Sequence, residues 1–120
     1  MKTALVIDDE PELLELLHYY FSQLNYDVIS FPDVVTTETV ESISPDIIVL
    51  DNNLGKKSGG ALCLELKNNS NTQHIPVILI SAYEGLQKIA KDSHADAHIE
   101  KPFDIGNMYT TIKNVSMPSA

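Results

Sequence analysis

Five polar groups that could do chemistry together stand where short apolar runs end. Each run stops at an acid, a hydroxyl or an ammonium group. If the runs are neighbouring parallel strands, their carboxyl ends border one crevice, and these groups converge there although they lie far apart in sequence. They are two adjacent acids, one further acid, one serine and one lysine: Asp8, Asp9, Asp51, Ser81 and Lys101.

Such a cluster suits phosphoryl chemistry that depends on a divalent cation. Three neighbouring carboxylates repel one another, and Lys101 alone cannot neutralise them. Mg²⁺ can, because it prefers carboxylate, carbonyl and water oxygens, and Mn²⁺ accepts the same ligands. Asp51 can then act as a nucleophile and become an aspartyl phosphate. The cation and Lys101 would screen the charge on the phosphoryl oxygens.

The segments between these groups predict strands and helices in alternation. The helix that begins at Pro11 carries apolar residues at three- and four-residue spacing up to Leu24, so one of its faces belongs to the core. Residues 52–60, with three glycines, form an expected loop. The expected strands are 4–7, 28–31, 47–50, 77–80 and 97–100, and the expected helices are 11–24, about 33–43, 61–67, a short one near 86–90, and 105–115.

This alternation predicts an α/β fold with a doubly wound, five-stranded parallel sheet. Nearly continuous apolar strands are typical of a sheet that is covered on both faces. Right-handed crossovers then distribute the five helices over both sides. Periodicity alone does not determine the order of the strands.

Composition restricts the class of protein. The chain of 120 residues has the length of one domain, expected to span residues 1–120. Its 8 basic and 17 acidic residues give a net charge of −9, which disfavours direct contact with nucleic acid or an anionic membrane. No apolar run is long enough for a membrane span, and Cys63 has no partner for a disulfide. These features predict a cytoplasmic protein.

The chain resembles the receiver domains of two-component response regulators, and the resemblance covers essentially its whole length. It implies a flavodoxin-like sheet in the order 2-1-3-4-5. It also implies a chemotaxis-receiver-like domain that either stands alone or belongs to a longer regulator. The matching segments are Leu5–Glu10; Ile47–Asp51 with Leu54 and Ser58–Gly59; Ile80–Ala82; and Lys101–Phe103.

The resemblance implies a role for each residue of the cluster. Asp51 corresponds to the phosphoacceptor, Asp9 to a direct metal ligand and Asp8 to a ligand that acts through water. Asn53 would offer its backbone carbonyl to the metal. Lys101 would pair with the phosphoryl group.

Further positions match the family's switch and loop, and two depart from its pattern. Ser81 would turn to hydrogen-bond the phosphoryl group, Gly59 matches the loop glycine, and Pro102 matches the residue that follows the lysine through a cis bond. Gly55 replaces the usual proline. His98 replaces the tyrosine or phenylalanine of the switch, and its imidazole titrates near neutral pH.

The function implied by the resemblance is a phosphorelay receiver rather than an enzyme. It would take a phosphoryl group from a histidine kinase or a histidine phosphotransfer protein. It would then switch a partner-binding surface on the fourth helix, fifth strand and fifth helix. The alternative is a receiver-like interaction module that acts without phosphorylation. An aspartyl phosphatase is disfavoured because Asn53 stands where a second acid is needed. A flavin protein is disfavoured because no glycine-rich phosphate loop follows the first strand.

Overall fold

The computed structural model describes residues 1–54, 57–82, 85–101 and 103–116, without the side chains of Ile105 and Ser116. Strands and helices alternate along these residues. The order is β1 (Lys2–Ile7), α1 (Pro11–Gln23), β2 (Tyr26–Phe31), α2 (Thr37–Ile43), β3 (Ile47–Asp51), α3 (Gly59–Lys67), β4 (Val77–Ser81), α4 (Leu86–Asp92), β5 (Ala97–Glu100) and α5 (Ile105–Ser116).

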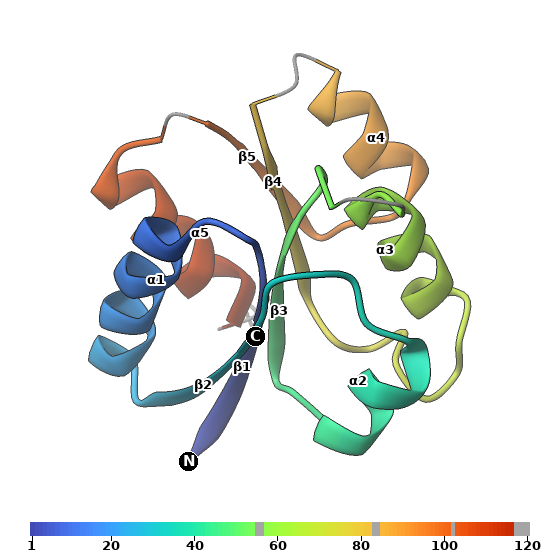
Figure 1. The fold of residues 1–120 in the computed structure, drawn as a ribbon, viewed down its shortest axis with the longest axis horizontal. Helices are drawn as coiled ribbons and strands as arrows, with labels where there is room; N and C mark the ends of the chain where they lie inside the picture. The colour runs from blue at the N-terminus through green and yellow to red at the C-terminus, as the bar shows by residue number, and fades with distance from the viewer. Residues whose placement is uncertain (55–56, 83–84, 102, 117–120) are drawn as a thin grey trace.

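The strands form one parallel sheet in the order β2-β1-β3-β4-β5 (Figure 1). The expected α/β fold and the order implied by the resemblance are both confirmed. The central strand is β3, so its last residue, Asp51, stands in the middle of the edge where the strands end. None of the described helices has the length and apolar character needed to cross a membrane.

Helices cover both faces of the sheet. Figure 1 shows α1 and α5 on one side and α2, α3 and α4 on the other. Two apolar clusters fill the spaces between the sheet and these layers. Strands β3 and β4 are buried along their whole length because both faces are covered, which explains their uninterrupted apolar sequences. Cys63 is buried in the second cluster, consistent with a packing role.

The sequence placed most elements correctly but missed some helix starts. Helix α2 begins at Thr37 rather than near Asp33, because the Thr36 hydroxyl caps it by accepting a hydrogen bond from the Thr39 N–H at 3.1 Å. Helix α3 begins at Gly59, inside the expected loop. The Ser58 hydroxyl caps this helix by accepting from the Ala61 N–H at 3.1 Å.

Candidate functional site

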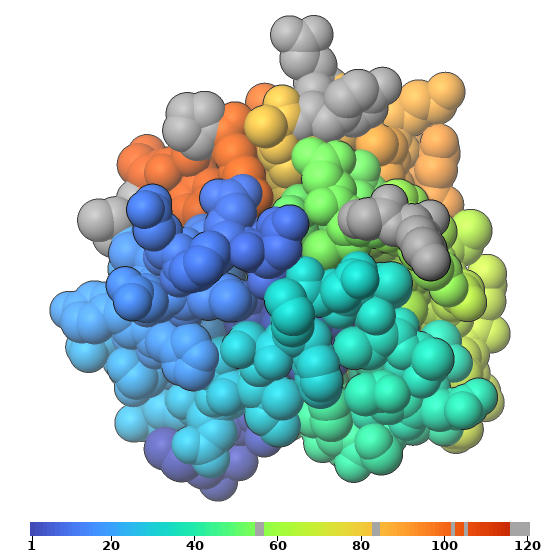
Figure 2. Space-filling model, viewed as in Figure 1, coloured from blue at the N-terminus to red at the C-terminus, as the bar shows by residue number. Residues whose placement is uncertain are grey.

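The predicted cluster forms at the edge of the sheet where the strands end. Asp8 follows β1, Asp51 and Ser81 are the last residues of β3 and β4, and Lys101 follows β5. In the space-filling view, the bright blue surface after β1 and the green surface after β3 adjoin in the upper half of this face (Figure 2). The topology therefore brings together groups that are up to 93 positions apart.

The centre of the site is a group of four acids. One carboxylate oxygen from each of Asp8, Asp9, Glu10 and Asp51 lies within 4.8 Å of the others. The Asp8 and Asp51 side chains are buried, with residue exposures of 0% and 2%, whereas Asp9 and Glu10 are exposed. Two of the acids are thus fixed in the protein interior and two face solvent.

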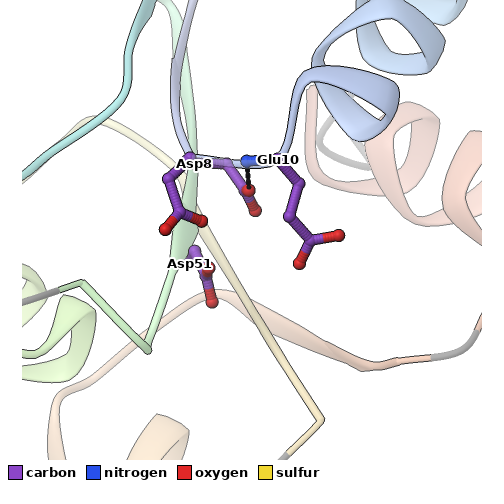
Figure 3. Close-up of side chains that lie close together, drawn as sticks. Asp8, Glu10 and Asp51 are labelled. Carbon is purple, nitrogen blue, oxygen red and sulfur yellow. Dashed lines mark hydrogen bonds between the residues drawn. The ribbon is translucent and has the colours of Figure 1, made fainter.

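Backbone N–H groups orient the two buried carboxylates. The Glu10 N–H donates to Asp8 Oδ1 at 2.8 Å (Figure 3). The Asn53 N–H donates to Asp51 Oδ1 at 3.1 Å. Each bond joins a carboxylate to the backbone two residues further on, in the turn that follows the strand. The second oxygen of each acid is not used by these bonds and faces Lys101, whose Nζ donates to Asp8 Oδ2 and lies 3.7 Å from Asp51 Oδ2.

Lys101 is the cation of this site and is shared among three of the acids. Its Nζ lies 2.6 Å from Glu10 Oε1, 3.4 Å from Asp8 Oδ2 and 3.7 Å from Asp51 Oδ2. The Lys101 side chain is only 17% exposed. One positive charge therefore faces several negative ones in a partly buried space.

Burial and mutual repulsion raise the pKa values of the two buried acids of the site. Burial raises the pKa of Asp8, and the carboxylates of Asp51 and Glu10 raise it further. Burial also raises the pKa of Asp51, and the Asn53 N–H and Lys101 offset only part of that rise. Burial alone would lower the pKa of Lys101, but its hydrogen bond to Glu10 and the nearby carboxylates raise it overall. The protonated lysine is the stable form.

Ser81 is fully buried at the end of β4, which pairs with β3. The Asn53 side-chain amide donates to Ser81 Oγ at 3.2 Å, which links the turn after β3 to the end of β4. Asn53 was predicted to act through its backbone carbonyl. In the structure its backbone N–H and its side chain both take part in hydrogen bonds around the site.

Gly59 is required by a close approach to the end of β3. A Cβ at this position would lie 2.2 Å from the carbonyl oxygen of Asp51. The Gly59 N–H also donates to the Asn52 carbonyl at 3.0 Å, and the Gly60 N–H donates to Asn52 Oδ1 at 2.9 Å. These hydrogen bonds hold the start of α3 against the turn that follows Asp51, and only glycine fits at position 59.

His98 lies on β5, an edge strand, and its side chain is exposed. Its partner in the sheet register is Leu79, two residues before Ser81. It lines a hollow of about 860 Å³ together with Asp96 and His74. Pro102 and Gly55, two further positions singled out in the sequence, lie outside the described residues.

The sequence interpretation missed two residues of the site. Glu10 makes the shortest contact with Lys101, and the buried Asn52 side chain fastens the start of α3. A signal existed for Glu10, because it is the third acid of the run after β1. For Asn52 the sequence offers only its place next to Asp51.

The donor set fits a hard divalent cation. All four clustered side chains offer carboxylate oxygens, the ligands that Mg²⁺ prefers, and two of the four face solvent and leave room for water ligands. Among the described residues, the acids of the pocket outnumber its one paired cation, Lys101. Asp8, Asp9 and Asp51 are the side chains that would hold the cation.

The family model that matches this chain is described as the response regulator receiver domain and covers residues 4–113. The chain is 31% identical over 116 residues to the DNA-binding dual master transcriptional regulator RpaA of Synechocystis, covering 94% of this chain and 48% of that protein. It is also 31% identical over 117 residues to the alkaline phosphatase synthesis regulator PhoP of Bacillus subtilis, covering 95% and 48%. The chain thus spans about half the length of these curated relatives.

Solved structures share the fold. A response regulator protein from Burkholderia multivorans is 28% identical, with a TM-score of 0.77 and coverage of 100% of this chain and 98% of that one. The receiver domain of a sensor histidine kinase from Pseudomonas aeruginosa has a TM-score of 0.82 at 19% identity, with coverage of 96% and 97%. That second structure is described as having a magnesium ion coordinated in its active site cleft.

Proposed function

The chain belongs to the response regulator receiver domain family of two-component signalling, and we propose that it accepts a phosphoryl group on Asp51. Receiver domains are phosphoacceptors rather than classical enzymes. The observation that carries this proposal is the position of Asp51, at the centre of the sheet edge, among acids and within 3.7 Å of Lys101. We also propose that residues 1–120 form one receiver domain and that the protein acts in the cytoplasm.

The proposed donor is a phosphohistidine on a histidine kinase or a phosphotransfer protein. A carboxylate oxygen of Asp51 attacks the phosphorus atom, an O–P bond forms as the N–P bond breaks, and the donor imidazole keeps the electron pair and takes up a proton. The Asn53 N–H holds Oδ1 of Asp51, so Oδ2 is the oxygen available for attack. Lys101 would interact with the charge that develops on the phosphoryl oxygens.

We propose that the reaction depends on Mg²⁺ or Mn²⁺. Receiver domains bind Mg²⁺ at an acidic pocket, and the acids of this chain form such a pocket. Asp9 would be a direct ligand, Asp8 a ligand through water, and the Asn53 carbonyl a third contact. The bound ion would supply positive charge that lets an anionic phosphoryl group approach Asp51.

We propose that the output surface consists of α4, β5 and α5. Receiver domains act on downstream effectors, and Ser81 and His98 lie on strands that connect the site to this surface. Phosphorylation would draw the Ser81 hydroxyl toward the phosphoryl group, and the His98 ring, now exposed, would turn inward.

The acceptor is tested by intact mass after incubation with a small phosphodonor and magnesium. The native protein should gain about 80 Da, the mass of one phosphoryl group. Asp51→Asn should show no adduct. Glu15→Gln, which changes an exposed acid on α1, is the matched control and should label as the native protein does. Equal labelling of Asp51→Asn would assign the phosphate to another residue.

The relay through His98 is tested by comparing the native protein with His98→Tyr. Phosphorylation should strengthen binding of the downstream partner, or self-association, by less in the native protein than in the variant. Coupling that does not change with the substitution would exclude the ring as the relay.

The second candidate function is a receiver-like interaction module that works without phosphorylation. The exposed His98 in place of an aromatic switch residue is the observation in its favour. Partner binding that is the same for the native protein and for Asp51→Asn, with and without phosphodonor, would support it. The complete acceptor site argues for the first function.

A further inference from the structure

Lys101 has a preferred partner, and that partner is not the acceptor. Its Nζ lies 2.6 Å from Glu10 Oε1, a short charge-assisted hydrogen bond, but 3.7 Å from Asp51 Oδ2, beyond hydrogen-bond distance. The lysine that a phosphoryl group on Asp51 needs is therefore engaged elsewhere.

We propose that Glu10 is a positioning residue that holds Lys101 away from Asp51, so that phosphorylation requires Lys101 to exchange Glu10 for the phosphoryl group. This inference rests on the proposed function and adds a regulatory role for a residue to which that function assigns none. Glu10 would set how readily the site accepts and retains a phosphoryl group.

The surroundings of the pair favour such an exchange. The Glu10 side chain is 56% exposed, so water can solvate its carboxylate once Lys101 leaves. Asp8, the other close partner of Lys101, is fully buried and bound to the Glu10 N–H, so it cannot move away in the same manner. The Lys101–Glu10 pair is exposed on its Glu10 side, and a partly exposed ion pair is weaker than a buried one, so a doubly charged phosphoryl group can displace it.

The position of Glu10 in the chain supports the role. It directly precedes Pro11, the first residue of α1, so its backbone is fixed between β1 and α1. Its side chain reaches Lys101, which follows β5, 91 residues further along the chain. Release of this contact would remove the side-chain link between Lys101, which follows β5, and Glu10, which precedes α1. Among the described residues, Lys101 forms ion pairs with Asp8, Glu10 and Asp51 only.

The test measures the affinity of beryllofluoride, a mimic of the phosphoryl group, at saturating Mg²⁺ by calorimetry. Glu10→Gln should bind it about two- to fivefold more tightly than the native protein, as expected when one partly exposed ion pair no longer competes. Glu12→Gln is the matched control, because Glu12 is exposed, carries the same charge and stands two residues away. It should change the affinity by less than about twofold.

A double-mutant cycle separates loss of the pair from loss of charge. In the Lys101→Gln background, Glu10→Gln should lose most of its effect, because no lysine remains to be released. Equal effects in the two backgrounds, or equal effects of Glu10→Gln and Glu12→Gln, would overturn the inference. Melting temperatures close to that of the native protein would exclude a folding defect as the cause.

Failure of the inference differs from failure of the proposed function. If the native protein gains a phosphoryl group on Asp51 and binds beryllofluoride, but Glu10→Gln behaves as the native protein does, only the role of Glu10 is wrong. If the native protein neither gains mass nor binds the mimic with Mg²⁺ present, the acceptor function itself is wrong.

Discussion

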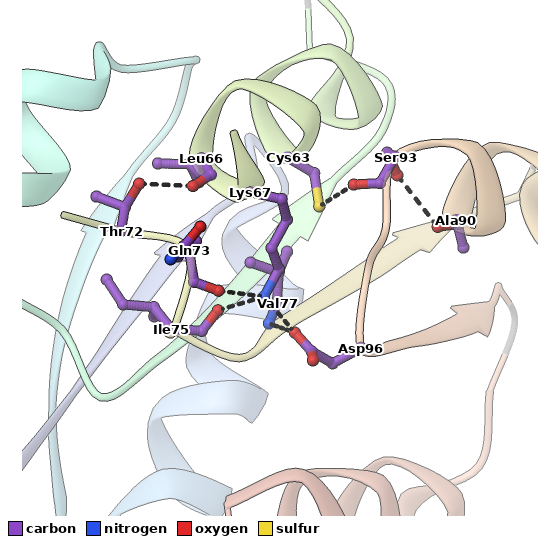
Figure 4. A network of polar contacts seen from close by, with 10 residues as sticks. All are labelled: Cys63, Leu66, Lys67, Thr72, Gln73, Ile75, Val77, Ala90, Ser93 and Asp96. Carbon is purple, nitrogen blue, oxygen red and sulfur yellow. Dashed lines mark hydrogen bonds and ion pairs between the residues drawn. The ribbon is translucent and has the colours of Figure 1, made fainter. Parts of the chain in front are cut away.

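Two nearly buried lysines, at opposite ends of the sheet, have very different surroundings. Lys67 ends α3, and its side chain is 11% exposed. Its Nζ donates to Asp96 Oδ2 at 2.7 Å, to the Ile75 carbonyl at 2.8 Å and to the Gln73 carbonyl at 3.3 Å (Figure 4). Lys101 is similarly buried, at 17%, but all three of its neighbours are carboxylates.

The different partners of the two lysines distinguish a structural contact from a site that can bind a ligand. An ammonium group has three N–H donors, and Lys67 finds one acceptor for each, of which a single one is charged. Asp96 in turn accepts from the Val77 N–H at 2.8 Å, so the network ties α3 to the starts of β4 and β5. Among the described residues around Lys101 the negative charges exceed the positive ones, and an added cation would balance them.

Lys67→Met should cause the largest loss of stability. It removes the Lys67 donor from two carbonyls and the charged partner from Asp96, which keeps the Val77 N–H, at a cost of about 2 to 3 kcal/mol in the free energy of unfolding. The value stays below that of a fully buried pair because the Asp96 side chain is 42% exposed. Urea unfolding measures it.

Lys88→Met, at an exposed position on α4, is the control for loss of a lysine and should change the stability by less than about 0.5 kcal/mol. Labelling of Asp51 should survive in Lys67→Met under conditions where the protein is folded. If Lys67→Met were as stable as Lys88→Met, the hydrogen bonds of Lys67 would not stabilise the fold, and its contrast with Lys101 would be wrong.

Mg²⁺ should stabilise the acidic site and leave the Lys67 network unaffected. An ion that binds only the folded state adds about 2.7 kcal/mol at a concentration of 100 times its dissociation constant. Thermal unfolding across a magnesium titration measures this. Asp9→Ala should abolish most of the rise in melting temperature, whereas Lys67→Met should retain it. A native melting curve that does not move with millimolar magnesium would contradict the metal site.

Much of the fold and part of the site could be predicted because they depend on local patterns. Apolar runs identified the strands, and the residues that follow them marked the edge where ligands bind in an open α/β sheet. Asp51 was placed correctly at the end of the third strand on this basis alone. The order of the strands came from the resemblance to a family, since periodicity carries no information on it.

The partners of the two lysines could not be predicted in this manner. Lys101 bonds to Glu10 across 91 residues and Lys67 to Asp96 across 29. A pattern of burial shows which face of an element is inside, but the partner of a long, flexible side chain depends on distances set by the whole fold. The late start of α2 has a local cause. Val and Thr residues precede the helix without a break in pattern, and the hydrogen bond from the Thr39 N–H to the Thr36 hydroxyl sets the first residue of the helix.

The smallest effect concerns the charge of Asp51 in the absence of magnesium. Burial raises its pKa in the folded protein above the value of 3.8 for an unperturbed aspartate. Between that value and the raised pKa the folded state binds more protons than the unfolded state, so the free energy of unfolding falls as pH rises. Above the raised pKa the full cost of the buried charge remains. Asp51→Asn removes this cost, while its amide oxygen can still accept from the Asn53 N–H.

Asp51→Asn should therefore be more stable than the native protein at pH 7 with a chelator present, by about 1 kcal/mol. The difference should shrink as pH falls through the raised pKa, because the native Asp51 carboxylate then takes up a proton and the native protein no longer bears the cost of a buried charge. Urea unfolding at several pH values measures it, with Glu15→Gln as the control for loss of an exposed acid. A native protein as stable as Asp51→Asn at neutral pH would mean that Lys101 already balances the acceptor, and the contrast with Lys67 would lose its basis.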